Sequence, residues 1–242
     1  MSTGNARGKT LRYVVIALVV MALLSAAVFA ATLISGGDGQ ASAPISAPTL
    51  ETNNTFSIVS DESTVRFSLD EELFGQATHV VGETDQVAGD IAVDFTTPAN
   101  SEVGVIRINV RTLATDRDMR DRAIRSFILQ SADDRYEFAQ FTPTAITGLP
   151  ETITMGTAFT FQITGDLLIR DVTQSATFDV TVTPESDTRL SGHAQATVTR
   201  ASYGLEIPNA PGVANVSDDV LVEIDFVAVK GAAAAATAEA SS

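Results

Sequence analysis

The amino-acid sequence predicts an all-β protein: an up-and-down antiparallel β-barrel of about eight strands with one amphipathic helix, preceded by a single transmembrane helix. Three observations lead to this prediction. Apolar and polar residues alternate along most of residues 56–230, one segment within that range has the period of a helix, and an uncharged apolar run lies near the N-terminus. Alternation with a period of two buries one face of a strand and leaves the other in water, as in antiparallel sheets.

The apolar run covers residues 13–34 and contains no charged side chain over 22 residues. As a helix it would reach about 33 Å, enough to cross a hydrocarbon core of about 30 Å. Residues 1–12 contain three basic side chains and no acidic one, so the positive-inside rule places them in the cytoplasm and the domain outside a single-pass cell-membrane anchor. The alternative is a signal peptide cleaved after Val28-Phe29-Ala30, which would leave the domain secreted or periplasmic.

Two segments that flank the domain lack a pattern that could pack. Residues 35–55 are rich in Gly, Ala, Ser and Pro, which predicts a flexible linker. Residues 231–242 are mostly alanine and predict a disordered tail. The range between them, residues 56–230, has the size of one ordinary domain.

Alternation assigns a set of apolar side chains to the inner face of the predicted barrel. An eight-stranded barrel is just wide enough either to be filled by its own side chains or to hold one slender ligand, and both alternatives are open at this point. The predicted lumen residues are Phe67, Leu69, Ile106, Ile108, Phe159, Phe161, Ile163, Phe178, Val180 and Phe226.

Residues 116–130 break the alternation and have the period of an amphipathic helix. The polar side of this segment carries basic and acidic side chains at a spacing of four, which stabilises a helix modestly. We expect the helix to cover one end of the barrel. The residues expected to face the barrel are Met119, Ala123, Ile124, Phe127 and Ile128.

The composition excludes several classes of function. With 30 acidic and 15 basic residues the formal net charge is −15, whereas nucleic-acid binding needs clustered Lys and Arg. Cysteine is absent, which excludes disulfides, thiolate nucleophiles and Cys-ligated metals. His79 and His193 lack the spacing of a zinc site, and neither a nucleophile elbow nor a P-loop occurs. We therefore expect no enzymatic activity, no metal and no cofactor.

Five blocks of sequence, in order and suitably spaced, are similar to the YceI family, the lipocalin-like polyisoprenoid-binding domain of bacteria. Taken singly, none of them is diagnostic, but together they extend over most of residues 56–230. The blocks are Ser63–Leu69 (STVRFSL), Arg120–Ser126 (RDRAIRS) with Tyr136 and Phe138–Thr144 (FAQFTPT) after it, Gly165–Thr173 (GDLLIRDVT), Ala196–Leu205 (ATVTRASYGL) and Asp219–Ile224 (DVLVEI).

The chain departs from the family pattern at three positions. Ala123 stands where the R-D block commonly has a histidine, Ser202 replaces an acid, and Glu137 replaces the proline after the tyrosine. These changes leave the barrel pattern intact, but they remove a histidine that could contact a polar headgroup.

The resemblance implies a lipocalin-like barrel whose apolar lumen holds a long isoprenoid lipid, either a polyprenyl diphosphate or an isoprenoid quinone. A diphosphate would need arginines, and Arg120 and Arg200 are the headgroup candidates because both lie in matching blocks. The helix arginines, however, are also spaced to pair with acids on the same helix, which would favour an uncharged, quinone-like head.

Two functions are compatible with these expectations. The first is a membrane-tethered extracytoplasmic binding protein that stores, shields or transports an isoprenoid lipid. The second is a structural or interaction domain of the cell envelope whose barrel is filled by its own side chains.

Overall fold

The computed structural model describes residues 41–42, 45–50, 52 and 54–231. The predicted membrane segment, residues 13–34, and the predicted tail from residue 232 onward lie outside this part of the chain. Among the described residues, none of the helices combines the length and the apolar character needed to cross a membrane.

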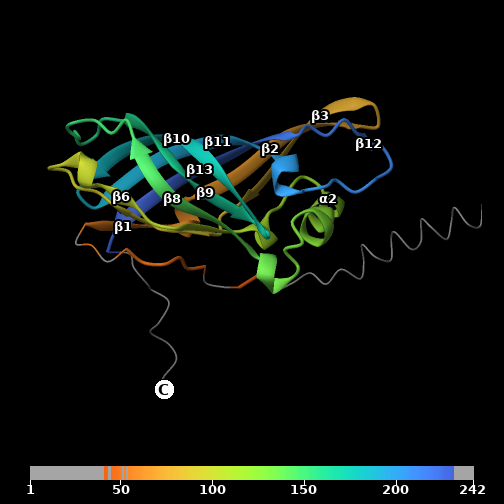
Figure 1. Ribbon diagram of the computed structural model, residues 1–242, viewed down its shortest axis with the longest axis horizontal. Helices are drawn as coiled ribbons and strands as arrows, with labels where there is room; N and C mark the ends of the chain where they lie inside the picture. Colours follow the sequence, from red (N-terminus) through yellow and green to blue (C-terminus); the bar gives the residue numbers. More distant parts are fainter. Residues whose placement is uncertain (1–40, 43–44, 51, 53, 232–242) are drawn as a thin grey trace, which may run out of the picture. The chain divides into compact units, whose positions relative to one another are not determined.

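The described domain is one curled antiparallel sheet with a short helical segment at one end (Figure 1). Its strands are β1 (Thr55–Ile58), β2 (Thr64–Leu73), β3 (Gln76–Thr84), β4 (Val87–Ala88), β5 (Asp90–Ala92), β6 (Glu102–Val103), β7 (Ile106–Asn109), β8 (Phe138–Thr147), β9 (Phe159–Ile169), β10 (Val172–Ser186), β11 (Arg189–Thr199), β12 (Val213–Ala214) and β13 (Asp219–Lys230). The antiparallel, mostly β architecture with one helix is confirmed. The sequence predicts about eight strands, whereas the described part has thirteen, of which seven have nine or more residues.

Hydrogen-bonded neighbours follow the order β4-β7-β8-β9-β10-β11-β13-β1-β5-β6. The second edge of β13 is shared, because residues 221–225 pair with β2 whereas residues 228–230 pair with β1. β2 in turn pairs with β3, and β4 follows β3 directly and pairs with β7. The sheet therefore curls around an interior that is lined by its apolar face.

Alternation along the long strands sets which side chains reach this interior. In β10, the buried residues Phe178, Val180 and Val182 alternate with polar residues on the outer face. The register pairs Phe178 with Ile163 and Val180 with Phe161 on β9, so inward residues of neighbouring strands lie side by side.

Gly192 on β11 makes room for the Phe226 ring of β13. A Cβ at this position would lie 2.4 Å from Phe226 Cζ and 2.9 Å from the backbone oxygen of Thr181, both closer than ordinary contact. We expect Gly192→Ala to lower the free energy of unfolding by about 1–3 kcal/mol, measured by urea denaturation. Ser191→Ala, on the opposite face of β11, is the control, with an expected change within about 0.5 kcal/mol. Equal midpoints for the two variants would contradict the close approach.

The predicted helix is shorter and less regular than its pattern indicates. α2 (Asp118–Ala123) runs into a π-helical turn, η4 (Ile124–Ile128), in which Leu129 N donates to Ile124 O at 2.8 Å. A π turn widens the helix and shifts the phase of its faces. Ile124 is buried as expected, but the prediction that Met119 faces the barrel is wrong, since it is 65% exposed. The 3-10 helices are η1 (Ser60–Glu62), η2 (Pro98–Asn100), η3 (Val110–Thr112), η5 (Asp134–Tyr136) and η6 (Arg200–Tyr203).

The described part of the predicted linker is held against the domain. Ser42 donates from its backbone N and its Oγ to the Glu137 carboxylate at 2.6 and 2.7 Å. Arg107 donates to Ser46 O at 3.0 Å, and Leu50 N donates to Asp90 Oδ2 at 3.0 Å. The composition of this segment predicts a chain without contacts. The side chains that bind the segment lie far away in the sequence, so composition alone does not reveal them.

Candidate functional site

An apolar cavity of ≈ 120 Å³ lies inside the curled sheet. Its wall is built from inward residues of β1, β2, β5 to β11 and β13. The wall is almost entirely aliphatic and aromatic, so the cavity offers dispersion contacts and exclusion of water to a ligand, with few polar contacts.

Eight of the ten predicted lumen residues line this cavity. Phe67 and Leu69 do not, although they share a face of β2 with Val65, which does. They lie further along the strand, where Phe67 packs on a small separate cluster of Val110, Leu113 and Ala139. Alternation thus predicts the face of β2 on which these side chains lie, but β2 extends past the end of the cavity. The eight lining residues are Ile106, Ile108, Phe159, Phe161, Ile163, Phe178, Val180 and Phe226.

Most of the other wall residues lie on the long strands, but a few come from segments without alternation, and the sequence does not single these out. Leu149 and Ile153 belong to the β8–β9 loop, which lies between Gly148 and Gly156, both at positive φ. Ser101 and Glu102 follow η2 and begin β6. Between the two glycines the sequence has three large apolar side chains, Leu149, Ile153 and Met155, and nothing in it marks the first two as wall residues.

Glu102 of β6 is the one exposed residue among those that line the cavity. Figure 1 shows β6 and the β8–β9 loop at one end of the domain and α2 at the other. The predicted helix therefore lies at the end of the domain away from β6.

The headgroup candidates Arg120 and Arg200 are not on the cavity wall. Arg120, with a side chain 14% exposed, donates to Glu71 Oε1 at 2.8 Å and also pairs with Asp116. Arg200 donates to Leu205 O at 2.6 Å and lies 3.9 Å from Asp218. Both are engaged in contacts within the protein, because α2 and η6 use them to attach to neighbouring segments.

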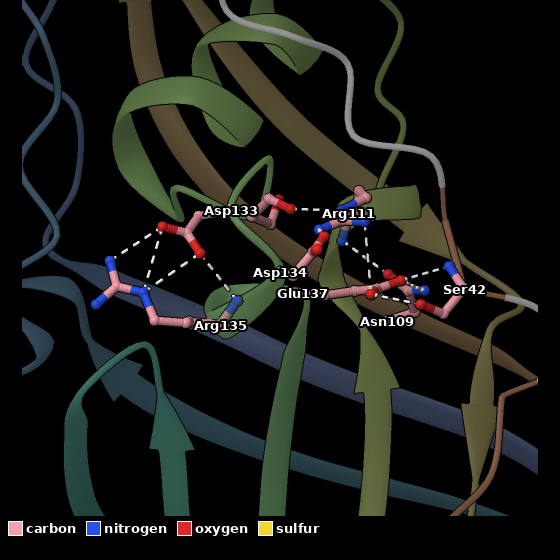
Figure 2. Close-up of polar contacts among 8 residues, drawn as sticks. Ser42, Asn109, Arg111, Asp133, Asp134, Arg135 and Glu137 are labelled. Carbon is pink, nitrogen blue, oxygen red and sulfur yellow. Dashed lines mark hydrogen bonds and ion pairs between the residues drawn. The ribbon is translucent and has the colours of Figure 1, made fainter.

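A buried polar cluster, also missed by sequence reasoning, lies near the helical end (Figure 2). We call it the Glu137 cluster: the buried Glu137, Arg111 and Asn109, with the exposed Ser42 and Asp134 at its edge. The side chains of Glu137 and Arg111 are each 3% exposed and their charged groups approach to 3.5 Å. Asn109 Nδ2 donates to Glu137 at 2.7 Å, and Arg111 also donates to Ser131 O and Asp134 Oδ1 at 2.6 and 2.8 Å.

Burial alone would raise the pKa of Glu137, but hydrogen bonds from Ser42 and Asn109 and the charge of Arg111 hold it below its ordinary value. Glu137 thus stays ionised in the interior. None of the cluster residues lines the cavity, and we assign the cluster a structural role: it fixes the ends of β7 and β8 and the segment around Ser42.

The two histidines lie on separate strands, β3 and β11. His79 contacts Asp70 and His193 contacts Asp225, each at 2.8 Å. Within the described ranges, no group of three or more His, Asp or Glu side chains is arranged to hold a metal ion.

Comparison with solved structures gives related folds. A polyisoprenoid-binding domain from Saccharophagus degradans, implicated in plant cell wall breakdown, aligns with a TM-score of 0.56 and 17% identity, covering 72% of this chain and 97% of that one. BcnA from Burkholderia cenocepacia aligns with a TM-score of 0.54 and 17% identity, covering 70% and 98%. No curated protein matches the chain. At this identity the likeness establishes the fold, which is lipocalin-like.

The match to a family model is more direct evidence of relationship, because it covers residues 56–228 without a break, which is well over half of the chain. These are nearly the bounds of the domain that the strand pattern predicts, and they contain every strand except the first residue of β1 and the last two of β13. This match, together with the curled antiparallel sheet and its apolar cavity, shows that the chain belongs to the family of YceI-like domains.

Proposed function

We propose that this domain is a binding protein that holds an isoprenoid lipid in its apolar cavity, and that it acts outside the cytoplasm, tethered to the membrane, to store, shield or transport that lipid. The observation that carries the proposal is the wall of the cavity, which is apolar from β2 to β13 and is interrupted by only two polar residues, Ser101 and Glu102.

If the lipid fills the cavity, the volume of the cavity determines how much apolar contact contributes to the free energy of binding. One buried water occupies about 10–15 Å³ on the same measure, so ≈ 120 Å³ takes about ten methylene-sized groups. At about 0.8 kcal/mol each, they contribute roughly 8 kcal/mol before the costs of ordering the ligand. A longer prenyl chain must extend out of the cavity or displace the β8–β9 loop.

The relatives support the ligand class, since the Saccharophagus degradans domain is described as polyisoprenoid-binding. The tethering and the location rest on the sequence alone: an uncharged run of 22 residues follows a basic segment at the N-terminus. A binding role also agrees with the absence of any catalytic motif in the sequence.

The proposal is tested by organic extraction of the full-length chain after purification in a mild detergent, followed by mass spectrometry. We expect an isoprenoid lipid in near-stoichiometric amount. A chain that is folded by circular dichroism and carries no lipid, even after incubation with an isoprenoid quinone, would favour the structural or interaction domain with a filled barrel.

Narrowing the cavity should reduce the lipid more than it affects folding. Ile108 lines the wall, so we expect Ile108→Trp to lower co-purifying lipid several-fold and the melting temperature only modestly. The matched control is Val81→Trp, at a 39% exposed position outside the wall, which should keep its lipid. In a filled barrel the Ile108 change is overpacking, and it would destabilise by about 1–3 kcal/mol with no lipid to lose.

A further inference from the structure

The residues that precede β1 lie along the outside of the domain, from one end to the other (Figure 1). We call the described residues 41–42, 45–50, 52 and 54 the N-terminal strap. Asn54, at its end, accepts from Lys230, and the register places Lys230 beside Phe56, Phe56 beside Ile91, and Ile91 beside β6. Ser42, at its start, is bound instead in the Glu137 cluster at the helical end, where α2 lies.

Two further contacts hold the middle of the strap. Arg107 of β7 donates to Ser46 O at 3.0 Å, and Leu50 N donates at 3.0 Å to the carboxylate of Asp90, which is 7% exposed. The Leu50 side chain packs on Gly104, where a Cβ would lie 3.1 Å from Leu50 Cγ. Together with Ser42, these contacts move the point at which the preceding chain leaves the domain from the β6 end to the helical end.

This point decides which end of the domain a membrane anchor holds close. If residues 13–34 cross the membrane, Ser42 is eight positions after Ile34, and eight residues reach at most about 28 Å. Without the strap contacts the same anchor would lead to Thr55, 21 positions after Ile34, with a reach of up to about 75 Å to the β6 end. The strap therefore keeps the helical end near the lipid surface.

The helical end presents two exposed apolar side chains. Phe74, at the tip of the β2–β3 hairpin, is 74% exposed, and Met119 of α2 is 65% exposed. The two elements adjoin, because Arg120 of α2 donates to Glu71 of β2 at 2.8 Å. Phe74 has a φ of 50°, and its N donates to Gly212 O at 2.6 Å. A bulky residue rarely adopts this left-handed conformation, and such strain is found preferentially at functional sites.

The charge at this end also suits a lipid surface better than the charge of the rest of the domain. Residues 116–135, which include α2 and η4, contain five Arg and five Asp and so have no net charge, whereas the whole chain has a formal net charge of −15. An anionic membrane surface repels an acidic protein face and attracts a basic one, so it repels the helical end least.

We propose that the helical end docks on the bilayer that anchors the chain, with Phe74 and Met119 entering the headgroup region and the strap fixing this orientation. The inference rests on the membrane tether of the proposed function and deepens it. Exposed apolar side chains gain from entering the interface because they leave water. Exposure alone does not identify the docked end, since Met155 on the β8–β9 loop, at the β6 end, is 46% exposed.

The chain contains no tryptophan, so a single introduced Trp reports only on its own position. Full-length Phe74→Trp, Met119→Trp and Met155→Trp are reconstituted into phosphatidylcholine vesicles with and without bromine on the acyl chains, which quenches Trp fluorescence on contact. We expect at least twofold more quenching at positions 74 and 119 than at position 155. Met155→Trp is the matched control, because it also replaces an exposed methionine but lies at the opposite end.

Release of the strap should reduce this difference. Ser42→Pro lacks both donors to Glu137, and Arg107→Ala removes the donor that binds the middle of the strap. Placed together in the Phe74 and Met155 reporters, they should at least halve the ratio of quenching between the two positions. Ser42→Ala keeps the backbone donor and should retain most of the ratio.

Equal quenching at the three positions, or stronger quenching at position 155, would overturn the inference. A ratio that survives release of the strap would show that the strap does not set the orientation. A chain that does not float with the vesicles would reject the membrane tether and the inference with it. A chain that floats and carries lipid, but is quenched equally at both ends, would reject only the docked orientation.

Discussion

Glu137→Ala is expected to lower the free energy of unfolding by about 3–5 kcal/mol, the largest loss that we predict for a single substitution. The change leaves the Arg111 guanidinium, 3% exposed, without its buried partner, although Asp134 still accepts from it at the surface. It also removes the acceptor for Asn109 Nδ2 and for both donors of Ser42. Urea denaturation with a constant m-value measures the loss.

A double-mutant cycle separates the buried charge from the packing around it. Replacing both partners, Arg111→Met with Glu137→Leu, should cost less than the sum of the two single changes, because no uncompensated charge remains inside. Additive losses would show that the two groups do not interact in the folded protein. Limited proteolysis of Glu137→Ala should also show faster cleavage around residues 41–50, since Ser42 loses its anchor.

The stability that Glu137 contributes depends on pH in a defined direction. Its pKa is lower in the folded protein than the ordinary value of about 4.3, so its contribution is fully present above that value and is lost as the pH falls through the folded pKa. The difference in stability between the wild type and Glu137→Gln should therefore be largest near pH 6 and shrink below about pH 4. A difference that stays constant from pH 6 to pH 3 would contradict a lowered pKa.

The contacts of the Glu137 cluster could not be predicted from the sequence. Asn109 ends a strand that alternation identifies and Arg111 lies just after it, yet an arginine in such a place is usually solvated, and nothing local marks this one as buried. Its partner Glu137 is 26 residues away, and Ser42 is 95 residues from Glu137, in a segment whose composition predicts a linker. Pairings over such separations are set by the curl of the sheet, which the period of two does not encode.

The inner face of the long strands, by contrast, was predicted well because it depends on local alternation alone. On β7, β9, β10 and β13 the predicted lumen residues all line the cavity. Alternation does not show where a cavity ends, and Phe67 and Leu69 lie on the part of β2 that extends beyond it. Met119 precedes the π turn, and five residues separate it from the buried Ile124, about 140° around a regular helix, so a face centred on Ile124 leaves Met119 outside it.

A second large effect is expected from Leu190→Ala, which should lower the free energy of unfolding by about 2–5 kcal/mol when lipid has been removed. Leu190 is fully buried on β11, opposite Ala228 of β13, and it lines the cavity. The substitution removes three carbon atoms from a wall that has small neighbours and so enlarges a space that cannot easily collapse. Thermal unfolding of the delipidated full-length chain measures the loss.

The same substitution tests whether the cavity is a ligand site, because a ligand that binds only the folded state raises its stability according to its concentration and affinity. Added geranylgeraniol should raise the melting temperature of Leu190→Ala, and by more than it raises that of Gly192→Ala, whose added methyl meets Phe226 and Thr181 and opens no new space. In a filled barrel, both variants would be destabilised and the lipid would restore neither. Recovery specific to Leu190→Ala requires the lipid to occupy the space that the leucine vacated, and that outcome distinguishes a lipid carrier from a domain whose apolar interior serves only its own stability.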